Sequence, residues 1–505
     1  MRDLLHDPAC APEDLGRPIP DSPHACLVCL PTWDSVIGYE EQRPEVIGKL
    51  EAGYPRFFLH PEVDKLFRSV ERRIGAAGER VVVFPRAEVC ERARCFVQRR
   101  EGVAGRVVEV DGLWALVVPV TAYATARAYW RHTGEVVSSR QAVDYASGRL
   151  LGSGPRAGFR EAMAEVLEVK PEDCFLFESG MAAIFTAYRI LTARRPGRKT
   201  LQVCFPYVDA LKVQEHFGAG VDFVPRSHGS ELQEEIQRVR SGLYAAVFSE
   251  VPSNPLLTTP DLEALSEACR SSGTPLVVDD TICSHANLKI LPHVDLVTTS
   301  LTKWVSGVGD VLAGAVKINP ESAVAAELRE ALQTAAPEGS RLYPADAEVL
   351  RHNATGFRRR VELANRHGEQ VAEALRGHSA VAAVHYPKFH DRARYDRLRV
   401  DGGGYGGLVS FVPAPEVSTP AVYDALRLSK GPSLGTEFSL VSPYTMLAHY
   451  EELDWAEACG VAPNLLRLSV GLEDPQVVIA ALEEALEAGA ERSGPGLAAA
   501  EPCGK

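Results

Sequence analysis

The sequence feature that most constrains the fold is a series of short apolar runs between residues 245 and 320. Each run has the length and the continuous apolar character of a strand that is buried on both faces. The four runs are AAVFSEV (245–251), PLVVDD (275–280), DLVTTS (295–300) and LAGAVKI (312–318). Strands of this kind are typical of the largely parallel sheets of α/β proteins, in which helices cover both faces.

The segment TTPDLEALSEACRSSG joins the first two runs and has the pattern of an amphipathic helix. Thr259 is a candidate N-cap, Pro260 would take the first helical position, and Gly273 would end the helix. A strand, a helix and a second strand in this order form a βαβ unit, which requires parallel strands. The sequence therefore predicts an α/β fold with a mostly parallel sheet.

The chain of 505 residues is too long for one average domain. A long helical pattern near residues 356–377, an alternating strand pattern at 406–413 and a helix after Asp474 indicate a smaller α+β domain near the C-terminus. Both ends are rich in small residues, Pro or Gly and read as mobile tails. The expected division is a tail at 1–23, an N-terminal extension at 24–150, a large domain at 151–345, a small C-terminal domain at 346–490 and a tail at 491–505.

Composition narrows the class of protein. The formal net charge of −13 argues against a nucleic-acid or anionic-membrane partner and favours a small-molecule ligand. No apolar run reaches the length of a membrane span, and the N-terminus lacks the apolar core of a signal peptide. Among the 11 cysteines, Cys26 and Cys29 form one CxxC pair, but no second cysteine or histidine pair completes the spacing of a metal finger. We expect a cytoplasmic protein without a metal site.

Three groups point to one kind of chemistry. Lys303 follows the apolar run 295–300, and Asp279 lies at the carboxyl end of the run 275–280, where ligands bind in open parallel sheets. Ser179, Gly180 and Met181 lead directly into an apolar helix, whose first N–H groups can bind a phosphate. An amine, a carboxylate and an anion-binding helix start are what pyridoxal phosphate requires. Ser300 and Thr302 flank the lysine and could add phosphate contacts, although turn formation alone would also explain them.

Several motifs carry a resemblance to a known family. SLTKWVSGVGDVLAGAV, EVPSNP, SGMAA, HYP, KGPSLG and LLRLSVGLED occur in order between about residues 150 and 490. In these motifs the chain resembles the Cys/Met-metabolism family of pyridoxal-phosphate enzymes. The segments LPTWDSVIGYE, GYPRFF, HTGEVVSSR, FPYVDALKV and GPSLGTEFSLVSPYTMLAHY extend the resemblance to the long, fungal-type cystathionine γ-synthases. The resemblance implies fold type I, with a homodimer or homotetramer whose active sites lie at the subunit interface.

The resemblance also implies roles for individual residues. Lys303 would form a Schiff base with the cofactor and then move protons. Asp279 would pair with the pyridinium nitrogen, and Tyr207 in FPYVDALKV would stack on the ring and act as an acid or base. Asn254 in PSNP would lie near the ring hydroxyl. The competing interpretation of Tyr207 is a buried core tyrosine, and that of Asn254 is an asparagine that only forms a turn.

Two further residues are assigned to the substrate by the resemblance. Arg467 in LLRLSVG would bind the α-carboxylate through a bidentate pair, a geometry that lysine cannot copy. A structural salt bridge is the alternative. Ser433 in GPSLG would orient the substrate, or would simply form a turn.

The chain departs from the family at the phosphate. Most members donate a Tyr-Ser-Arg motif across the dimer interface, about thirty residues before the phosphate-loop glycine. This chain has SSR ending at Arg140, which lies 40 residues before Gly180, and YPR from Tyr54 to Arg56, which ends 124 residues before it. We favour Arg140 because position along a shared fold is harder to change than one side chain. Tyr54 and Arg56 would then belong to the N-terminal extension.

The expected reaction is γ-replacement on O-succinyl- or O-acetylhomoserine with cysteine, which gives cystathionine. A γ-lyase acting on cystathionine or methionine, or a γ-substitution enzyme of specialised metabolism with another nucleophile, are the alternatives. Asp209 stands where methionine-degrading lyases resemble one another in having cysteine, which weakens that alternative. The segment GSGPRA (152–157) fits a loose dinucleotide motif, but no apolar strand precedes it, so an NAD enzyme is disfavoured.

Overall fold

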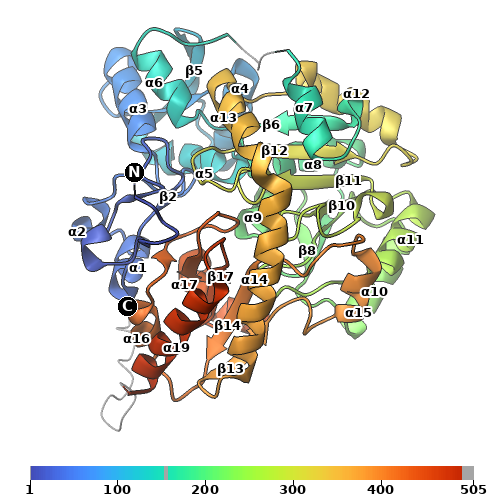
Figure 1. The fold of residues 1–505 in the computed structure, drawn as a ribbon. Coiled ribbons are helices and arrows are strands. Elements are labelled where there is room, and N and C mark those ends of the chain that lie inside the picture. Colours follow the sequence, from blue (N-terminus) through green and yellow to red (C-terminus); the bar gives the residue numbers. More distant parts are fainter. Residues whose placement is uncertain (1, 153–156, 492–505) are drawn as a thin grey trace.

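The structure is a computed structural model that describes residues 2–152 and 157–491 (Figure 1). Residues 153–156 of the dinucleotide-like segment and residues 492–505 of the predicted C-terminal tail lie outside the described residues. In the described part of the chain, no helix is both long enough and apolar enough to cross a membrane.

The large domain is built on a seven-stranded sheet with the strand order β6-β12-β11-β10-β9-β7-β8. All strands run parallel except β12, which is antiparallel to both of its neighbours. The strands are β6 (Cys174–Phe177), β7 (Thr200–Val203), β8 (Val221–Val224), β9 (Val247–Glu250), β10 (Leu276–Asp279), β11 (Leu296–Ser300) and β12 (Gly314–Ile318). The four apolar runs are β9 to β12, so the predicted α/β fold with a mostly parallel sheet is confirmed.

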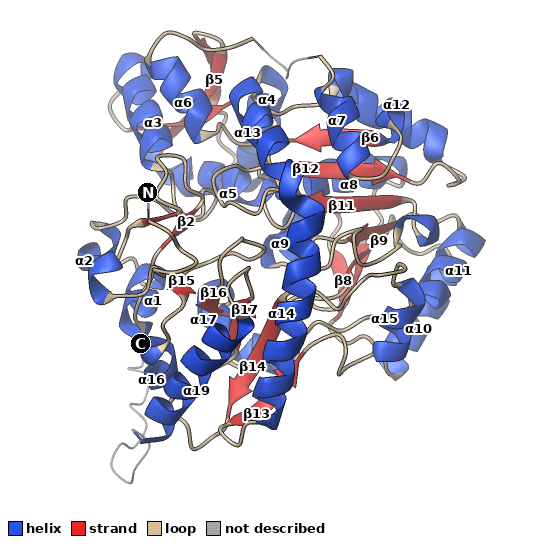
Figure 2. Ribbon diagram, in the orientation of Figure 1, coloured by secondary structure: helices blue, strands red, loops and turns tan. Residues whose placement is uncertain are grey.

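Helices cover this sheet on both sides, because its strands are apolar on both faces (Figure 2). They are α7 (Phe159–Val166), α8 (Gly180–Arg194), α9 (Val208–His216), α10 (Ser230–Arg240), α11 (Leu262–Ser272) and α12 (Ala325–Ala335). The predicted cap of α11 is wrong: Asp261, and not Thr259, accepts a hydrogen bond from Ala264 N at 3.1 Å. Gly273 ends the helix with a φ of 64°, as predicted.

The small domain contains a five-stranded sheet with the order β13-β14-β17-β16-β15. Its strands are β13 (Val381–His385), β14 (Leu408–Pro413), β15 (Ser429–Lys430), β16 (Leu440–Pro443) and β17 (Leu466–Ser469). The helices are α13 (Pro344–Asn353), α14 (Phe357–Gly377), α15 (Arg392–Leu398), α16 (Thr419–Ala425), α17 (Tyr444–Ala448), α18 (Leu453–Ala458) and α19 (Pro475–Glu491). The long helix α14 runs beside α19 over the sheet in both ribbon views.

The N-terminal extension, expected as one piece, has two parts. Residues 61–146 form a compact unit around the antiparallel sheet β3-β5-β4, which we call the N-terminal unit. It comprises α3 (Pro61–Ile74), β3 (Glu79–Phe84), α4 (Ala87–Glu101), β4 (Arg106–Val110), β5 (Leu113–Pro119), α5 (Tyr123–Thr133) and α6 (Ser139–Ala146). Residues 24–60, with α1 (Trp33–Glu40) and α2 (Pro44–Ile47), instead run along the small domain, where α1 contacts α16 and α17.

The first residues are packed, which contradicts the predicted mobile tail at 1–23 for the described residues 2–23. β1 (Pro18–Ile19) pairs with β2 (Leu27–Val28) in an antiparallel ladder. Ala9 N donates to Ser429 Oγ at 3.1 Å, and Ala9 O accepts from Lys430 N at 3.1 Å. These bonds fix the segment against the small domain.

Candidate active site

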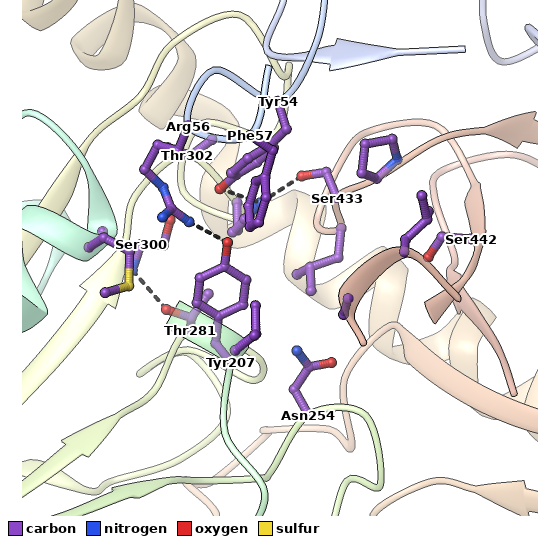
Figure 3. A pocket seen from close by; sticks show the side chains of 18 of the residues that line it. Tyr54, Arg56, Phe57, Tyr207, Asn254, Thr281, Ser300, Thr302, Ser433 and Ser442 are labelled. Atoms are coloured by element: carbon purple, nitrogen blue, oxygen red, sulfur yellow. Dashed lines mark hydrogen bonds between the residues drawn. The ribbon is translucent and has the colours of Figure 1, made fainter. Parts of the chain in front are cut away.

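One pocket is lined by residues of the large domain, of the small domain and of the N-terminal segment 24–60. It lies at the carboxyl ends of β9 and β10, beside the start of α8 and the turn after β11, and the small domain and the segment 39–57 close it (Figure 3). The sequence-predicted residues that line it are Tyr54, Arg56, Ser179, Gly180, Met181, Tyr207, Asn254, Asp279, Ser300, Thr302, Lys303, Ser433 and Arg467. Arg140 is the one predicted site residue that does not line this pocket.

Lys303 lies in the turn that follows β11, and only 8% of its surface is exposed. Its Nζ donates to Ser433 Oγ at 2.6 Å and to Tyr54 Oη at 3.3 Å, and it lies 4.6 Å from the centre of the Tyr54 ring. Burial lowers the pKa of the Lys303 amine, because the charged form loses solvation. This lysine is therefore held in place and biased toward its neutral, nucleophilic form.

Asp279 is the last residue of β10 and Asp280 follows it, but their surroundings differ. Asp280 is 2% exposed and pairs with Lys317 at 2.6 Å in the core. Asp279 lines the pocket, accepts from Thr281 N at 2.8 Å and has no cationic partner among the described residues. Burial raises the pKa of Asp279 to about 6. A cation or N–H donor inside the pocket would satisfy Asp279, whereas Asp280 is already satisfied.

The start of α8 forms the opposite wall of the pocket. Ser179 caps the helix by accepting from Ala182 N at 3.0 Å and donates its own hydroxyl to Gly134 O at 2.8 Å. A Cβ on Gly180 would lie 2.7 Å from Ser300 Cβ, so only glycine allows this close approach of α8 to β11. Ser300 N donates to Thr281 Oγ1, while the Thr302 hydroxyl accepts from Ala313 N. The first turn of α8 can bind an anion.

Tyr207 and Arg56 both line the pocket and contact each other through a hydrogen bond (Figure 3). The Arg56 guanidinium, 2% exposed, donates to Tyr207 Oη, to the Asp209 carboxylate and to Arg131 O. Asp209 is fully buried and also contacts His132 Nδ1 at 2.8 Å. Burial opposes its ionisation, but the Arg56 charge and the His132 hydrogen bond outweigh this and hold the pKa of Asp209 below its usual range.

Arg467 on β17 faces the pocket from the small domain and is 7% exposed. Its Nη1 donates to Asn254 Oδ1 and its Nη2 to Ser433 O, both at 2.9 Å. Its Nε is buried without a partner among the described residues, and no carboxylate pairs with it there. Among the described residues, Arg467 therefore does not form the structural salt bridge that was the alternative to substrate binding. A carboxylate ligand would satisfy its free Nε–H.

Arg140 does not line the pocket of its own chain, and its expected contact with the phosphate of a neighbouring subunit stays a prediction. Its Nη1 donates to Asp310 O at 2.8 Å and to Asp346 Oδ1 at 3.1 Å. The backbone carbonyl of Asp310 and the Asp346 carboxylate hold Arg140 outside the pocket, where it joins α6 of the N-terminal unit to the large domain. Tyr54 and Arg56 line the pocket instead, within the same chain.

Sequence reasoning assigned no place at this site to several polar residues that line or support it. Glu250 at the end of β9 accepts from Tyr207 N at 2.8 Å, and Tyr444 accepts from Asn254 Nδ2 at 3.5 Å. Asp209 and His132 support Arg56 from behind. Glu250 follows an apolar run as Asp279 does, so the same strand-end rule could have found it. No local pattern marks His132, which lies at the end of α5.

The residues present fit pyridoxal phosphate. Lys303, the unpaired Asp279, the free end of α8 and the aromatic ring of Tyr207 supply an amine, a partner for a ring N–H, an anion site and a stacking face in one pocket. Fold and site together define a pyridoxal-phosphate-dependent enzyme of fold type I.

Comparison with known families gives the same answer. The family described as Cys/Met metabolism PLP-dependent enzyme matches residues 113–487, and the family described as fungal trans-sulfuration enzyme, N-terminal domain, matches residues 62–138. The chain belongs to the Cys/Met metabolism family of pyridoxal-phosphate enzymes. The second match coincides with the N-terminal unit.

Individual relatives span nearly the whole chain. It is 30% identical to a cystathionine γ-synthase of Neurospora crassa, over 95% of this chain and 99% of the relative. It is 31% identical to an L-2-amino-4-chloropent-4-enoate dechlorinase/desaturase of Streptantibioticus cattleyicolor, over 93% and 98%. Among solved structures, cystathionine γ-synthase of Xanthomonas oryzae in complex with cystathionine is similar with a TM-score of 0.57 and 27% identity, over 66% of this chain and 85% of that one.

Proposed function

We propose that the protein catalyses γ-replacement on an O-acylhomoserine, the O-succinyl or the O-acetyl ester, with cysteine as the nucleophile. A carbon–sulfur bond forms at the γ-carbon while the ester carbon–oxygen bond breaks, and the thiol proton balances the carboxylic acid that leaves. The product is cystathionine. The observation that carries the proposal is the Lys303 amine, 2.6 Å from Ser433 Oγ, in the same pocket as the partly unpaired Arg467.

Pyridoxal phosphate, when bound, supplies an electron sink that lowers the cost of negative charge on the amino-acid substrate. Lys303 would take protons from the α- and β-carbons and return them, because burial lowers its pKa and enlarges its neutral fraction near pH 7. Ser433 and Tyr54 hold the amine at this position through their hydroxyls. Asp279 would bind the ring N–H.

Arg467 would bind the substrate α-carboxylate through its free Nε–H and a neighbouring Nη–H, in the bidentate geometry that arginine favours. Asn254 keeps the guanidinium oriented. Tyr207 would cover the cofactor ring, and Arg56 and the first turn of α8, with Ser179, Gly180 and Met181, would hold the phosphate. Ser300 and Thr302 line the same end of the pocket.

A second candidate is γ-elimination or substitution with another nucleophile in specialised metabolism. The similarity to the dechlorinase/desaturase of Streptantibioticus cattleyicolor favours it. A methionine lyase is less well supported, because Asp209 is fully buried and bound by Arg56 and His132, so it offers no group to the substrate.

The test is an assay of the pyridoxal-phosphate-loaded enzyme with each O-acylhomoserine, with and without cysteine. We expect cystathionine with cysteine, and less 2-oxobutyrate than without it. Abundant 2-oxobutyrate that cysteine does not change would reject the synthase and support the elimination candidate. The Lys303→Ala variant is the control and should form neither product. Cystathionine and methionine, each given alone, test the lyase activity directly.

We further propose that the enzyme acts in the cytoplasm as a homodimer or homotetramer and binds neither nucleic acid nor membranes. The acidic net charge of −13 supports the absence of nucleic-acid and membrane binding. Light scattering after size-exclusion chromatography will give the oligomeric state, and a monomeric mass would contradict the proposal.

A further inference from the structure

A second cavity, of about 620 Å³, lies between the N-terminal unit and the large domain. Arg92 and Arg99 on α4 line one side, and Arg189 near the end of α8 and Arg198 before β7 line the other. It shares no lining residue with the active-site pocket. Its volume is within the range of sites that bind small molecules, and such sites are common at domain interfaces.

The cavity is rich in positive charge. Its four arginines face one lining carboxylate, Glu91, which pairs with Arg94 at 2.5 Å outside the lining. Arg92 is paired with the buried Glu135. The Arg189 guanidinium makes no hydrogen bond or ion pair with any described residue; it lies over the Phe185 ring, 5.4 Å from its centre, and is attracted at longer range by Glu135, which Arg92 already pairs. A charged group in this position lacks the acceptor that it needs.

Three residues that line this cavity carry buried donor atoms without partners. Tyr188, 2% exposed, has a hydroxyl that finds no hydrogen-bond partner in the described chain, and the same holds for Nε of Arg189 and Nε of Arg92. Burial raises the pKa of Tyr188 to about 12, so its hydroxyl is protonated and can donate. Native proteins rarely leave such groups unsatisfied, and a bound ligand is a common reason when they do.

The remaining wall is aromatic. Phe185 and Phe217 pack edge to face with ring centres 5.1 Å apart, and Tyr129 lies 5.8 Å from Phe217. A ligand for this cavity therefore meets donors without acceptors on one side and flat apolar surface on the other. Inorganic ions would use only the first of these features.

We propose that this cavity binds an organic anion, whose carboxylate or phosphate group contacts Arg189 and Tyr188 and whose apolar body packs on Phe185 and Phe217. The site is separate from the reaction and does not rest on the proposed function, because binding is measured without substrate. α8 connects the two places: its first turn borders the active-site pocket, and Arg189, about 14 Å from Gly180 along the axis at 1.5 Å per residue, lines the cavity.

The test is isothermal titration calorimetry of the pyridoxal-phosphate-loaded enzyme with phenyl phosphate, benzoate, inorganic phosphate and phenol. We expect saturable binding of phenyl phosphate, of benzoate or of both, weaker binding of inorganic phosphate and none of phenol. Arg189→Gln should weaken the binding at least ~10-fold, and Tyr188→Phe roughly 5-fold, because each removes a donor to the anion.

Arg194→Gln is the matched control, since Arg194 is on the same helix but pairs with Glu327 at 2.6 Å outside the cavity. It should bind as the wild type does. Wild-type affinity in both Arg189→Gln and Tyr188→Phe would overturn the proposal, as would the absence of saturable binding of both organic anions. Equal binding of phenol would exclude an anion site, and equal binding of inorganic phosphate would exclude the apolar contact. If Arg189→Gln fails to fold by circular dichroism, Tyr188→Phe, which only loses an oxygen, decides the question.

Discussion

Asp279 and Asp280 are adjacent and chemically identical, yet the structure gives them opposite electrostatic surroundings. Asp280 is compensated by Lys317 in the core, and Asp279 is left unpaired at the pocket. The alternation of side chains along β10 places one on each side of the sheet. The charge that the fold leaves uncompensated is thus the one available for the ligand.

This difference predicts two distinct mutant phenotypes. Asp279→Asn should lower kcat by roughly 10²–10³-fold, because an electrostatic partner of the reacting system is lost. The cofactor-free protein should be as stable as the wild type or slightly more so, since a desolvated carboxylate is removed. Asp280→Asn leaves Lys317 buried and unpaired and should lower the free energy of unfolding by about 3–5 kcal/mol. Steady-state kinetics and urea unfolding measure the two effects, and an Asp279→Asn enzyme with near-normal kcat would contradict the assignment.

His285 provides a pH-dependent prediction. Burial, followed by the Lys317 charge, lowers its pKa from 6.5 to about 3, and its Nε2–H donates to Val166 O at 2.9 Å. The unfolded chain therefore binds a proton below pH 6.5 that the folded chain does not bind until about pH 3. The stability contribution is complete above pH 6.5 and is lost as the pH falls.

Between pH 6.5 and 4.5 this loss amounts to about 2.3 kcal/mol. In a His285→Phe variant, the free energy of unfolding should lose the part of its pH dependence that comes from this histidine. The free energies of unfolding of the variant and the wild type should therefore converge, or cross, as the pH falls. Urea titrations of the cofactor-free proteins at several pH values test this. Parallel pH profiles would show that the pKa of His285 is the same in the folded and unfolded chains.

At the scale of whole elements, β9 to β12 could be predicted because buried parallel strands leave an unbroken apolar run in the sequence. Lys303 and Asp279 could be found because strand ends in such a sheet bind ligands. The place of Arg56 in the pocket could not be predicted, because the distance along the chain does not show that a folded unit, residues 61–146, lies between this arginine and the phosphate loop. Asp209 was noted only as a departure from the family, since its role depends on contacts with Arg56 and His132, which are remote in sequence.

The junction of α8 with β11 gives a prediction at this scale. A Cβ on Gly180 would lie 2.7 Å from Ser300 Cβ and 3.1 Å from Ser300 Cα, so Gly180→Ala must push the first turn of α8 away from the strand that leads to Lys303. Such overpacking typically costs about 1–3 kcal/mol, and we expect cofactor affinity to fall roughly 10-fold with unchanged circular dichroism. Gly377→Ala is the control, because nothing lies within 4 Å of its added Cβ. Titration of the cofactor-free proteins with pyridoxal phosphate provides the measurement, and equal affinities for wild type and Gly180→Ala would refute the tight junction.

In the molecule as a whole, the pocket exists only where three remote stretches of chain meet. The segment around Tyr54 and Arg56, the large-domain turn with Lys303 and the small-domain strand with Arg467 each supply one wall (Figure 3). The first of these stretches is tied to the N-terminal unit through Arg131 O and His132, which contact Arg56 and Asp209. The extension therefore completes the site and is not an appendage beside it.

This arrangement predicts that Arg56 acts on the Lys303 of its own chain. Lys303→Ala and Arg56→Ala should each be inactive, and a mixed oligomer of the two should stay inactive, because every site then lacks one of the two residues. If Arg56 instead reached into a neighbouring subunit, the isolated mixed dimer would contain one complete site of its two and would have roughly half of the wild-type activity. Co-expression of the two variants with different tags, isolation of the mixed species and an activity assay distinguish these outcomes. Restored activity would show that the segment around Tyr54 and Arg56 is exchanged between subunits, and its absence, with each subunit folded and binding pyridoxal phosphate, would establish a site that one chain completes alone.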